Sequence, residues 1–104
     1  LLGANGGVNG GANMFPKLYV DLYKAAVAHD FDQIRILQDK VLAISSAIYT
    51  VGKYGSSYLK GLKCALSVMG LCDDFMADPF SHFKKEEREK IKEALDSLNY
   101  TEIV

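Results

Sequence analysis

The sequence predicts a mainly α-helical fold, on three observations. After residue 16, apolar side chains recur at steps of three and four residues in several stretches, which is the spacing of a helix with one buried face. Hydrophobic residues make up 49% of the 104 residues and charged residues 24%, a composition typical of globular and not of disordered chains. Most of the glycines, by contrast, precede Pro16. We therefore expect a glycine-rich head followed by a helical body.

The glycine-rich head contains one short apolar element, Gly6-Gly7-Val8-Asn9. This element indicates a single β-strand, followed by a tight loop that leads into the first helix. A lone strand is not stable by itself, because its backbone groups need a neighbouring strand. The head therefore predicts a strand whose partners lie outside these residues.

The first helix is expected to begin near Phe15-Pro16 and to end at residues 28–30. Proline at the first helical position costs no hydrogen bond, because that backbone N–H has no partner within a helix. One face of the segment is apolar, and it consists of Phe15, Leu18, Tyr19, Leu22, Ala25 and Ala26.

The second helix is the clearest of the predicted elements and should run to about Val51. Asp30 can cap it by accepting a hydrogen bond from an N–H of the first turn. Its apolar residues follow steps of three and four, which is typical of a buried, heptad-like seam. The seam consists of Ile34, Leu37, Val41, Ile44 and Ile48.

The third helix follows a turn bracketed by Gly52 and Gly55, and Ser56 or Ser57 is its expected cap. Gly70 is well placed as the left-handed residue after the last turn. The side chains expected to point inward are Leu59, Leu62, Ala65, Leu66 and Met69.

Residues 71–83 have no helical period and contain Asp78-Pro79, so they are expected to form a loop. A fourth helix is predicted over residues 84–98, although Lys84 stands where a capping Ser or Asp would help. Residues 99–104 are expected to fray. The apolar stripe of the fourth helix consists of Ile91, Ala94, Leu95 and Leu98.

The charge balance limits the partners of the chain. Twelve Lys and Arg stand against 13 Asp and Glu, for a net charge of −1, so there is no basic excess to bind nucleic acid and no polybasic patch for an anionic membrane. The uncharged stretch Leu1–Pro16 is too short and polar to span a bilayer, and no signal-peptide pattern is present. We expect no nucleic-acid partner, no membrane partner and a cytoplasmic location.

The sequence also predicts no metal and no cofactor. Cys64 and Cys72 are expected to be free, buried thiols in a reducing compartment. Two Cys and two His in no ligand spacing argue against structural zinc. Asp73, Asp74 and Asp78 lack the regular spacing of a calcium loop and are expected to be solvated.

Four segments together resemble one enzyme family. Residues 2–13, followed by Met14-Phe15-Pro16, resemble the eighth strand and following loop of the dihydrodipicolinate synthase / N-acetylneuraminate lyase family, pyruvate-dependent class I aldolases built on a (β/α)₈ barrel. Residues 18–38 resemble its eighth barrel helix and the first helix of its C-terminal extension. Residues 63–71 resemble its K-x-A-L-x-x-x-G-L helix, and residues 84–95 its terminal helix.

The resemblance implies that the chain is the C-terminal part of such a protein. Residues 1–29 would be strand eight, its loop and helix eight of the barrel, and residues 30–104 a three-helix C-terminal extension. A barrel of this type needs about 250 residues, so seven βα units would lie outside the chain. The family's Schiff-base lysine belongs to one of those units. We therefore expect no catalytic residue here and no activity of the chain alone.

In this family a lysine amine condenses with pyruvate, and the resulting enamine attacks an aldehyde or, in reverse, a carbon–carbon bond is cleaved. The resemblance implies that the Val8 carbonyl faces the Schiff base and that Asn9 and Gly10 line the wall near the second substrate. Sialic-acid lyases commonly carry Ser at the Gly10 position. The glycine therefore favours a synthase or a 2-keto-3-deoxy sugar acid aldolase over an N-acetylneuraminate lyase.

The expected partners are pyruvate and an aldehyde in the parent enzyme, and further copies of the chain. Homo-oligomers would form through the apolar faces of the first two helices, since these would otherwise be exposed. Lys63 matches a family lysine outside the barrel mouth and is expected to have a structural or interface role. The alternative is a self-sufficient helical interaction module with the head as a flexible arm, against which the missing initiator Met weighs.

Overall fold

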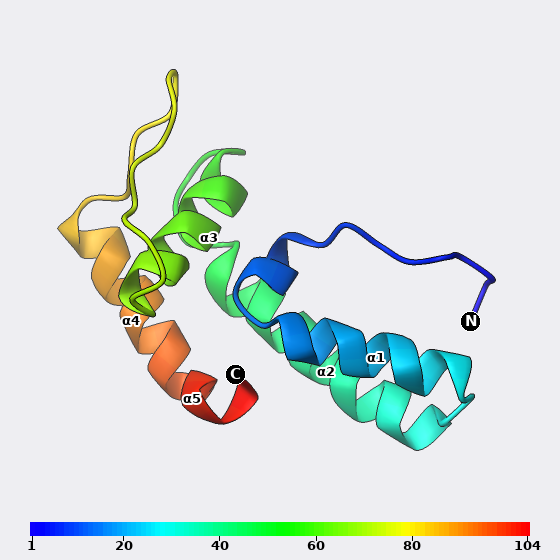
Figure 1. Cartoon of the computed structure of the whole chain (residues 1–104). Helices are drawn as coiled ribbons and strands as arrows, with labels where there is room; N and C mark the ends of the chain where they lie inside the picture. The colour runs from blue at the N-terminus through cyan, green and yellow to red at the C-terminus, as the bar shows by residue number, and fades with distance from the viewer.

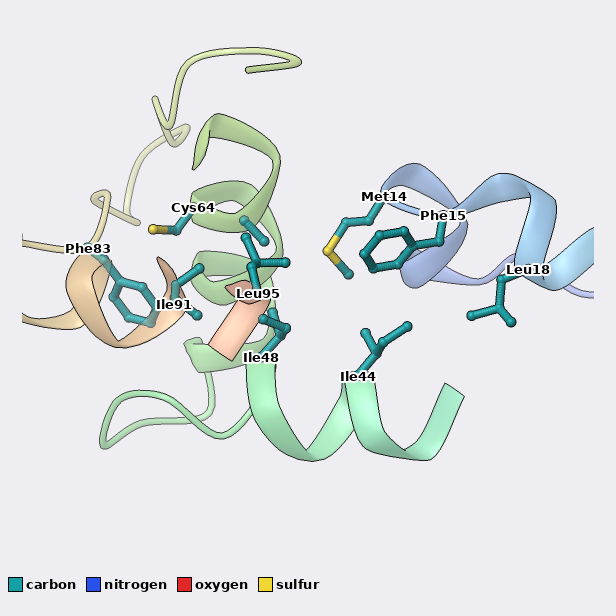
Figure 2. Packing of buried hydrophobic residues seen from close by; sticks show 10 residues of the cluster. Met14, Phe15, Leu18, Ile44, Ile48, Cys64, Phe83, Ile91 and Leu95 are labelled. Carbon is teal, nitrogen blue, oxygen red and sulfur yellow. The ribbon is translucent and has the colours of Figure 1, made fainter. Parts of the chain in front are cut away.

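The computed structural model describes residues 1–104 as one 3₁₀ turn and five α-helices, without a β-strand (Figure 1). Helices α1 and α2 form an antiparallel hairpin, and α3 and α4 pack against the C-terminal half of α2 (Figures 1 and 2). No helix is both long enough and apolar enough to cross a membrane. The elements are η1 (Gly10–Asn13), α1 (Pro16–Val27), α2 (Phe31–Ile48), α3 (Ser57–Val68), α4 (Lys85–Ser97) and α5 (Tyr100–Ile103).

Several helix ends are those that the sequence predicts. The Asp30 carboxylate accepts from the Gln33 N–H at 3.2 Å and caps α2. Pro16 opens α1, and Gly70 adopts φ +80° just after α3. Lys84 gives α4 no side-chain cap. Local chemistry at these positions is sufficient to set where the helices begin and end.

Three helix ends differ from the expectation. Helix α2 ends at Ile48 and not near Val51, since Tyr49 already forms its C-cap. Ser56 is the residue before α3 but makes no capping hydrogen bond, because its backbone is already helical. The chain does not fray after α4: residues 100–103 form α5 after the left-handed Asn99, and this short helix is held by packing on the core.

The strand expected at residues 6–9 does not form within these residues. Leu1–Asn9, which we call the arm, runs alongside α1 without secondary structure, and all nine residues are exposed (Figure 1). The backbone of Asn9 is nevertheless extended, with φ −98° and ψ 128°. A strand needs a hydrogen-bonded neighbour, and the chain offers the arm none.

The hydrophobic core is one continuous cluster that runs from η1 to α4 (Figure 2). Helix α2 joins its two parts: Ile44 faces Met14 and Phe15 on one side, while Ile48 lies toward α3 and α4. The seam predicted on the second helix is confirmed at these positions, both fully buried. The cluster crosses the predicted boundary at residue 30, and the division into two units stays a prediction.

Two expectations about burial are wrong. Leu59 is 43% exposed, because the inner face of α3 is formed by Gly61, Cys64 and Ala65 instead. The small side of α3 lets that helix lie close to the end of α2, which turns Leu59 outward. Cys72 is exposed in the loop after α3, so only Cys64 is a buried thiol; neither forms a disulfide.

Candidate functional site

The arm and α1 enclose an open groove of about 750 Å³. The arm contributes glycines and asparagines to it, and α1 contributes aromatic and aliphatic side chains together with Lys24. One wall is therefore small and polar, and the other is mainly apolar with one cationic side chain. Its lining residues include Asn5 and Asn9 from the arm and Tyr19 and Tyr23 from α1.

The three predicted pocket-wall residues occupy different environments. Val8 is fully exposed to solvent. Asn9 lines the groove, and its carbonyl accepts from the Ala12 N–H at 3.1 Å. Gly10 opens η1, and its carbonyl accepts from Asn13 Nδ2 at 3.0 Å. Within the chain only Asn9 belongs to the groove, and the roles of all three toward substrate stay predictions.

The turn η1 rests directly on tyrosine hydroxyls. A Cβ added to Gly10 would collide with the hydroxyl of Tyr58, and one added to Gly11 would collide with the hydroxyl of Tyr19. Glycine is needed at both positions because the backbone comes so close to these side chains. The two glycines therefore act in packing, and a larger residue could enter only if a tyrosine moved.

Three tyrosines meet under the turn, from α1, from the end of α2 and from α3; we call Tyr19, Tyr49 and Tyr58 the tyrosine cluster. The rings of Tyr49 and Tyr58 are 4.5 Å apart between centroids and tilted by 59°. The Tyr49 hydroxyl is buried and has no hydrogen-bond partner. Burial, followed by the neighbouring Tyr19 and Tyr58 hydroxyls, raises the pKa of Tyr49 to about 12. Burial first, and Tyr58 second, also raises the pKa of Tyr19.

The sequence predicts Tyr19 on the apolar face of the first helix but does not bring the three tyrosines together. The available signal was the Gly10-Gly11 pair in the loop before the first helix, since adjacent glycines permit close approach of a large side chain. Which side chains approach depends on the packing of three helices that are distant in sequence. The cluster is therefore a tertiary feature that spacing alone could not reveal.

Replacing Tyr49 by Phe is expected to change the alkaline stability of the protein. The fold holds the pKa of Tyr49 above its ordinary value, so it favours the neutral phenol. This contribution is fully present below about pH 10, the ordinary tyrosine pKa, and it is lost as the pH rises toward 12. Between about pH 9 and pH 11, one unit either side of the ordinary tyrosine pKa, Tyr49→Phe should therefore lose less stability than wild type. Urea unfolding at each pH measures the free energy of unfolding of the two proteins.

The matched control is Tyr54→Phe, since Tyr54 is 76% exposed. Below about pH 9, one unit under the ordinary tyrosine pKa, Tyr49→Phe should leave the stability unchanged or raise it slightly. The reason is that it removes a buried hydroxyl that has no hydrogen-bond partner. A Tyr49 variant with the same alkaline profile as Tyr54→Phe would contradict the burial of this phenol.

In the loop after α3, the Asp74 carboxylate pairs with a neighbouring helix and is not part of a ligand site. Asp74 forms an ion pair with Arg88 at 3.5 Å, and Arg88 also donates to Ser67 Oγ at 3.1 Å. Burial raises the pKa of the Cys64 thiol, and the nearby Arg88 opposes that shift.

No group of three or more His, Cys, Asp or Glu side chains is placed to hold a metal ion. Half-buried Lys63 lines a shallow apolar groove of about 240 Å³ beside the loop.

Comparison with known proteins gives a consistent result. The model of the dihydrodipicolinate synthetase family matches residues 1–98. The 4-hydroxy-tetrahydrodipicolinate synthase of Jannaschia sp. (strain CCS1) is 32% identical over 84 residues, which are 81% of this chain and 27% of that protein. The solved dihydrodipicolinate synthase of Bacteroides thetaiotaomicron matches with a TM-score of 0.90 and 62% identity, over 92% of this chain and 32% of that one.

The chain thus spans about a third or less of the length of these relatives. The family resemblance inferred from residues 2–16, 18–38, 63–71 and 84–95 is confirmed. So is the fold class: the chain is mainly α-helical and corresponds to the C-terminal helical part of a barrel enzyme. The chain belongs to the dihydrodipicolinate synthetase family.

Proposed function

We propose that the chain is the C-terminal part of a lyase that joins pyruvate to an aldehyde through a lysine Schiff base. The observation that supports this most strongly is the 62% identity to a dihydrodipicolinate synthase over 92% of the chain. In this proposal residues 1–29 complete the barrel and residues 30–104 form the helical extension. The synthase direction is preferred over sugar-acid cleavage, because both relatives are named as synthases.

In this mechanism the chain supplies part of the substrate pocket and not the nucleophile. A neutral lysine amine outside these residues attacks the keto carbon of pyruvate, and the carbonyl oxygen leaves as water to give an iminium. A base then removes a proton from C3, the C–H electron pair moves toward the iminium nitrogen, and C3 of the resulting enamine is the nucleophile. The arm and the turn after it bring backbone groups to the reaction: the Val8 carbonyl faces the Schiff base, and Asn9 and Gly10 form the wall near the aldehyde. The chain alone binds no pyruvate covalently and is inactive.

Assembly with further copies of the protein accompanies this proposal. The outer faces of α1 and α2 carry apolar side chains that the chain itself leaves exposed. In this proposal they are available for contact with the rest of the barrel and with further copies of the protein, as large exposed apolar patches are in general. They are Val20, Tyr23, Val27, Phe31, Ile36 and Leu42.

The test is reductive trapping. The purified chain, and separately the protein produced from the complete reading frame that contains it, are treated with pyruvate and borohydride and their intact masses are measured. Reduction converts a Schiff base into a permanent mass increase. The expected result is an unmodified 11.4 kDa chain and a modified full-length protein whose adduct maps outside these residues.

Two results would contradict the proposal. An adduct on the chain itself would put the nucleophile within it, and Lys63 would be examined first because it is half-buried beside an apolar groove. A reading frame that starts at Leu1 and yields a stable chain without any pyruvate adduct would favour the helical interaction module instead. Untreated protein and borohydride alone are the controls.

A further inference from the structure

We propose that Tyr58 and Tyr19, supported by Tyr49, are positioning residues that set where Asn9 and Gly10 stand relative to the aldehyde. This inference rests on the proposed function, because it concerns the same wall of the substrate pocket. It adds a role for residues in the helical part of the chain, none of which lies in the arm. Its structural basis is the contact of the tyrosine cluster with η1 and the packing of the Tyr49 and Tyr58 rings against each other.

The arm takes its position from the turn that follows it. All residues of the arm are exposed, and the first backbone hydrogen bond of the chain joins the Ala12 N–H to the Asn9 carbonyl at 3.1 Å. After the turn, Met14 and Phe15 are buried in the core. The turn is therefore fixed at its C-terminal end by Met14 and Phe15. The side chains that pack against the turn itself then determine the positions of Asn9 and Gly10.

The support from below is the tyrosine cluster. The Tyr58 hydroxyl lies against Gly10, and the Tyr19 hydroxyl lies against Gly11. Tyr58 is 39% exposed, so its ring would be free to swing outward if nothing held it. The Tyr49 ring holds it in place: its centroid lies 4.5 Å from that of Tyr58, the two rings are tilted by 59°, and the Tyr49 hydroxyl is buried. A rigid aromatic side chain has few rotatable bonds, which suits a spacer under a backbone turn.

The cluster acts through contact and not through charge. Burial holds the phenol pKa of Tyr49 and of Tyr19 above the ordinary value of about 10, so these two hydroxyls are neutral near pH 7. Removing a tyrosine should therefore alter the geometry of the wall without changing the electrostatics of the pyruvate site. The effect should fall on the substrate that the wall contacts.

The experiment measures the two substrates separately in the full-length protein. Pyruvate binding is followed by the pyruvate dependence of borohydride trapping, which needs no aldehyde. The aldehyde probe is aspartate semialdehyde, the four-carbon amino aldehyde obtained when the product named for the Jannaschia relative takes up one water and loses pyruvate. Tyr58→Ala is expected to raise the KM for the aldehyde about tenfold or more, while half-saturation by pyruvate changes less than about twofold. Tyr58→Phe, which keeps the ring, should lie between wild type and Tyr58→Ala.

The controls separate positioning from loss of structure. Tyr54→Ala removes an exposed tyrosine near the start of α3 and should change neither constant. A general loss of folding would lower kcat and the trapped fraction together and leave both half-saturation constants unchanged. Should Tyr58→Ala fail to fold, Gly10→Ala tests the same contact from the opposite side, with Gly6→Ala as its control because no atom lies within 4 Å of that position.

The pair Gly10→Ala and Tyr58→Ala also provides a double-mutant cycle. Each change should raise the KM for the aldehyde, and the double variant should be closer to wild type than the product of the two effects, since removing the ring makes room for the new methyl group. Equal KM values in Tyr58→Ala and wild type, or fully independent effects in the cycle, would overturn the inference. Failure of wild type to trap pyruvate would instead overturn the proposed function, so the two failures are distinguishable.

Discussion

Replacing Ile48 by Ala is expected to destabilise the chain by about 2–5 kcal/mol, the cost of truncating a fully buried aliphatic side chain. Ile48 is completely buried in the last turn of α2, where the core from η1 and α1 meets the core from α3 and α4 (Figure 2). The cavity would lie between elements that are held by one another, so little relaxation can fill it. Urea unfolding followed by far-ultraviolet circular dichroism measures the change.

The matched control for Ile48 lies on the same helix. Ile36 is 50% exposed, so Ile36→Ala makes the same chemical change without opening an internal cavity. It should cost no more than about 0.5 kcal/mol. Equal losses for the two variants would mean that the helices do not close around Ile48, and the packing of α2 against α3 and α4 would be wrong.

The helices could be predicted from the sequence because each has a strong local signal. The period of Ile44 and Ile48 defines the buried side of α2, and Asp30 and Gly70 provide a cap and a left-handed stop. These effects act between neighbours within a turn or two, so no knowledge of the tertiary structure is needed. The head was predictable as a separate segment for the same reason, since its composition changes at Pro16.

The errors in burial and at the C-terminus concern contacts between distant segments. Leu59 follows the apolar period of α3 but points outward, since Gly61 and Cys64 take the inner face. Tyr100 and Ile103 stabilise α5 only because the core lies beside them. In the candidate site, Gly10 could be singled out by resemblance, whereas its contact with Tyr58 depends on how three helices pack. Periodicity gives the apolar side of a helix, and not the depth at which a neighbour lies.

Gly61 provides the sharpest test of this packing, because local and tertiary effects predict opposite results. Within a helix, Ala is more favourable than Gly by about 1 kcal/mol, so propensity alone predicts that Gly61→Ala stabilises α3. In the structure, however, an added methyl group would lie 3.3 Å from the carbonyl carbon of Ile48 and closer still to its oxygen. That oxygen belongs to the backbone of α2 and cannot rotate aside. We therefore expect Gly61→Ala to destabilise the chain by about 1–3 kcal/mol, the usual cost of overpacking.

Gly55→Ala is the control, since Gly55 lies in the turn before α3 and no atom is within 4 Å of an added Cβ. That change should be neutral or stabilise the chain by up to about 1 kcal/mol, because it restricts the unfolded state. A double variant, Gly61→Ala with Ile48→Ala, should not recover the loss, since the obstructing atom belongs to the main chain. Stabilisation by Gly61→Ala would show that α3 lies farther from α2 than described, and the small inner face of α3 would then have no structural reason.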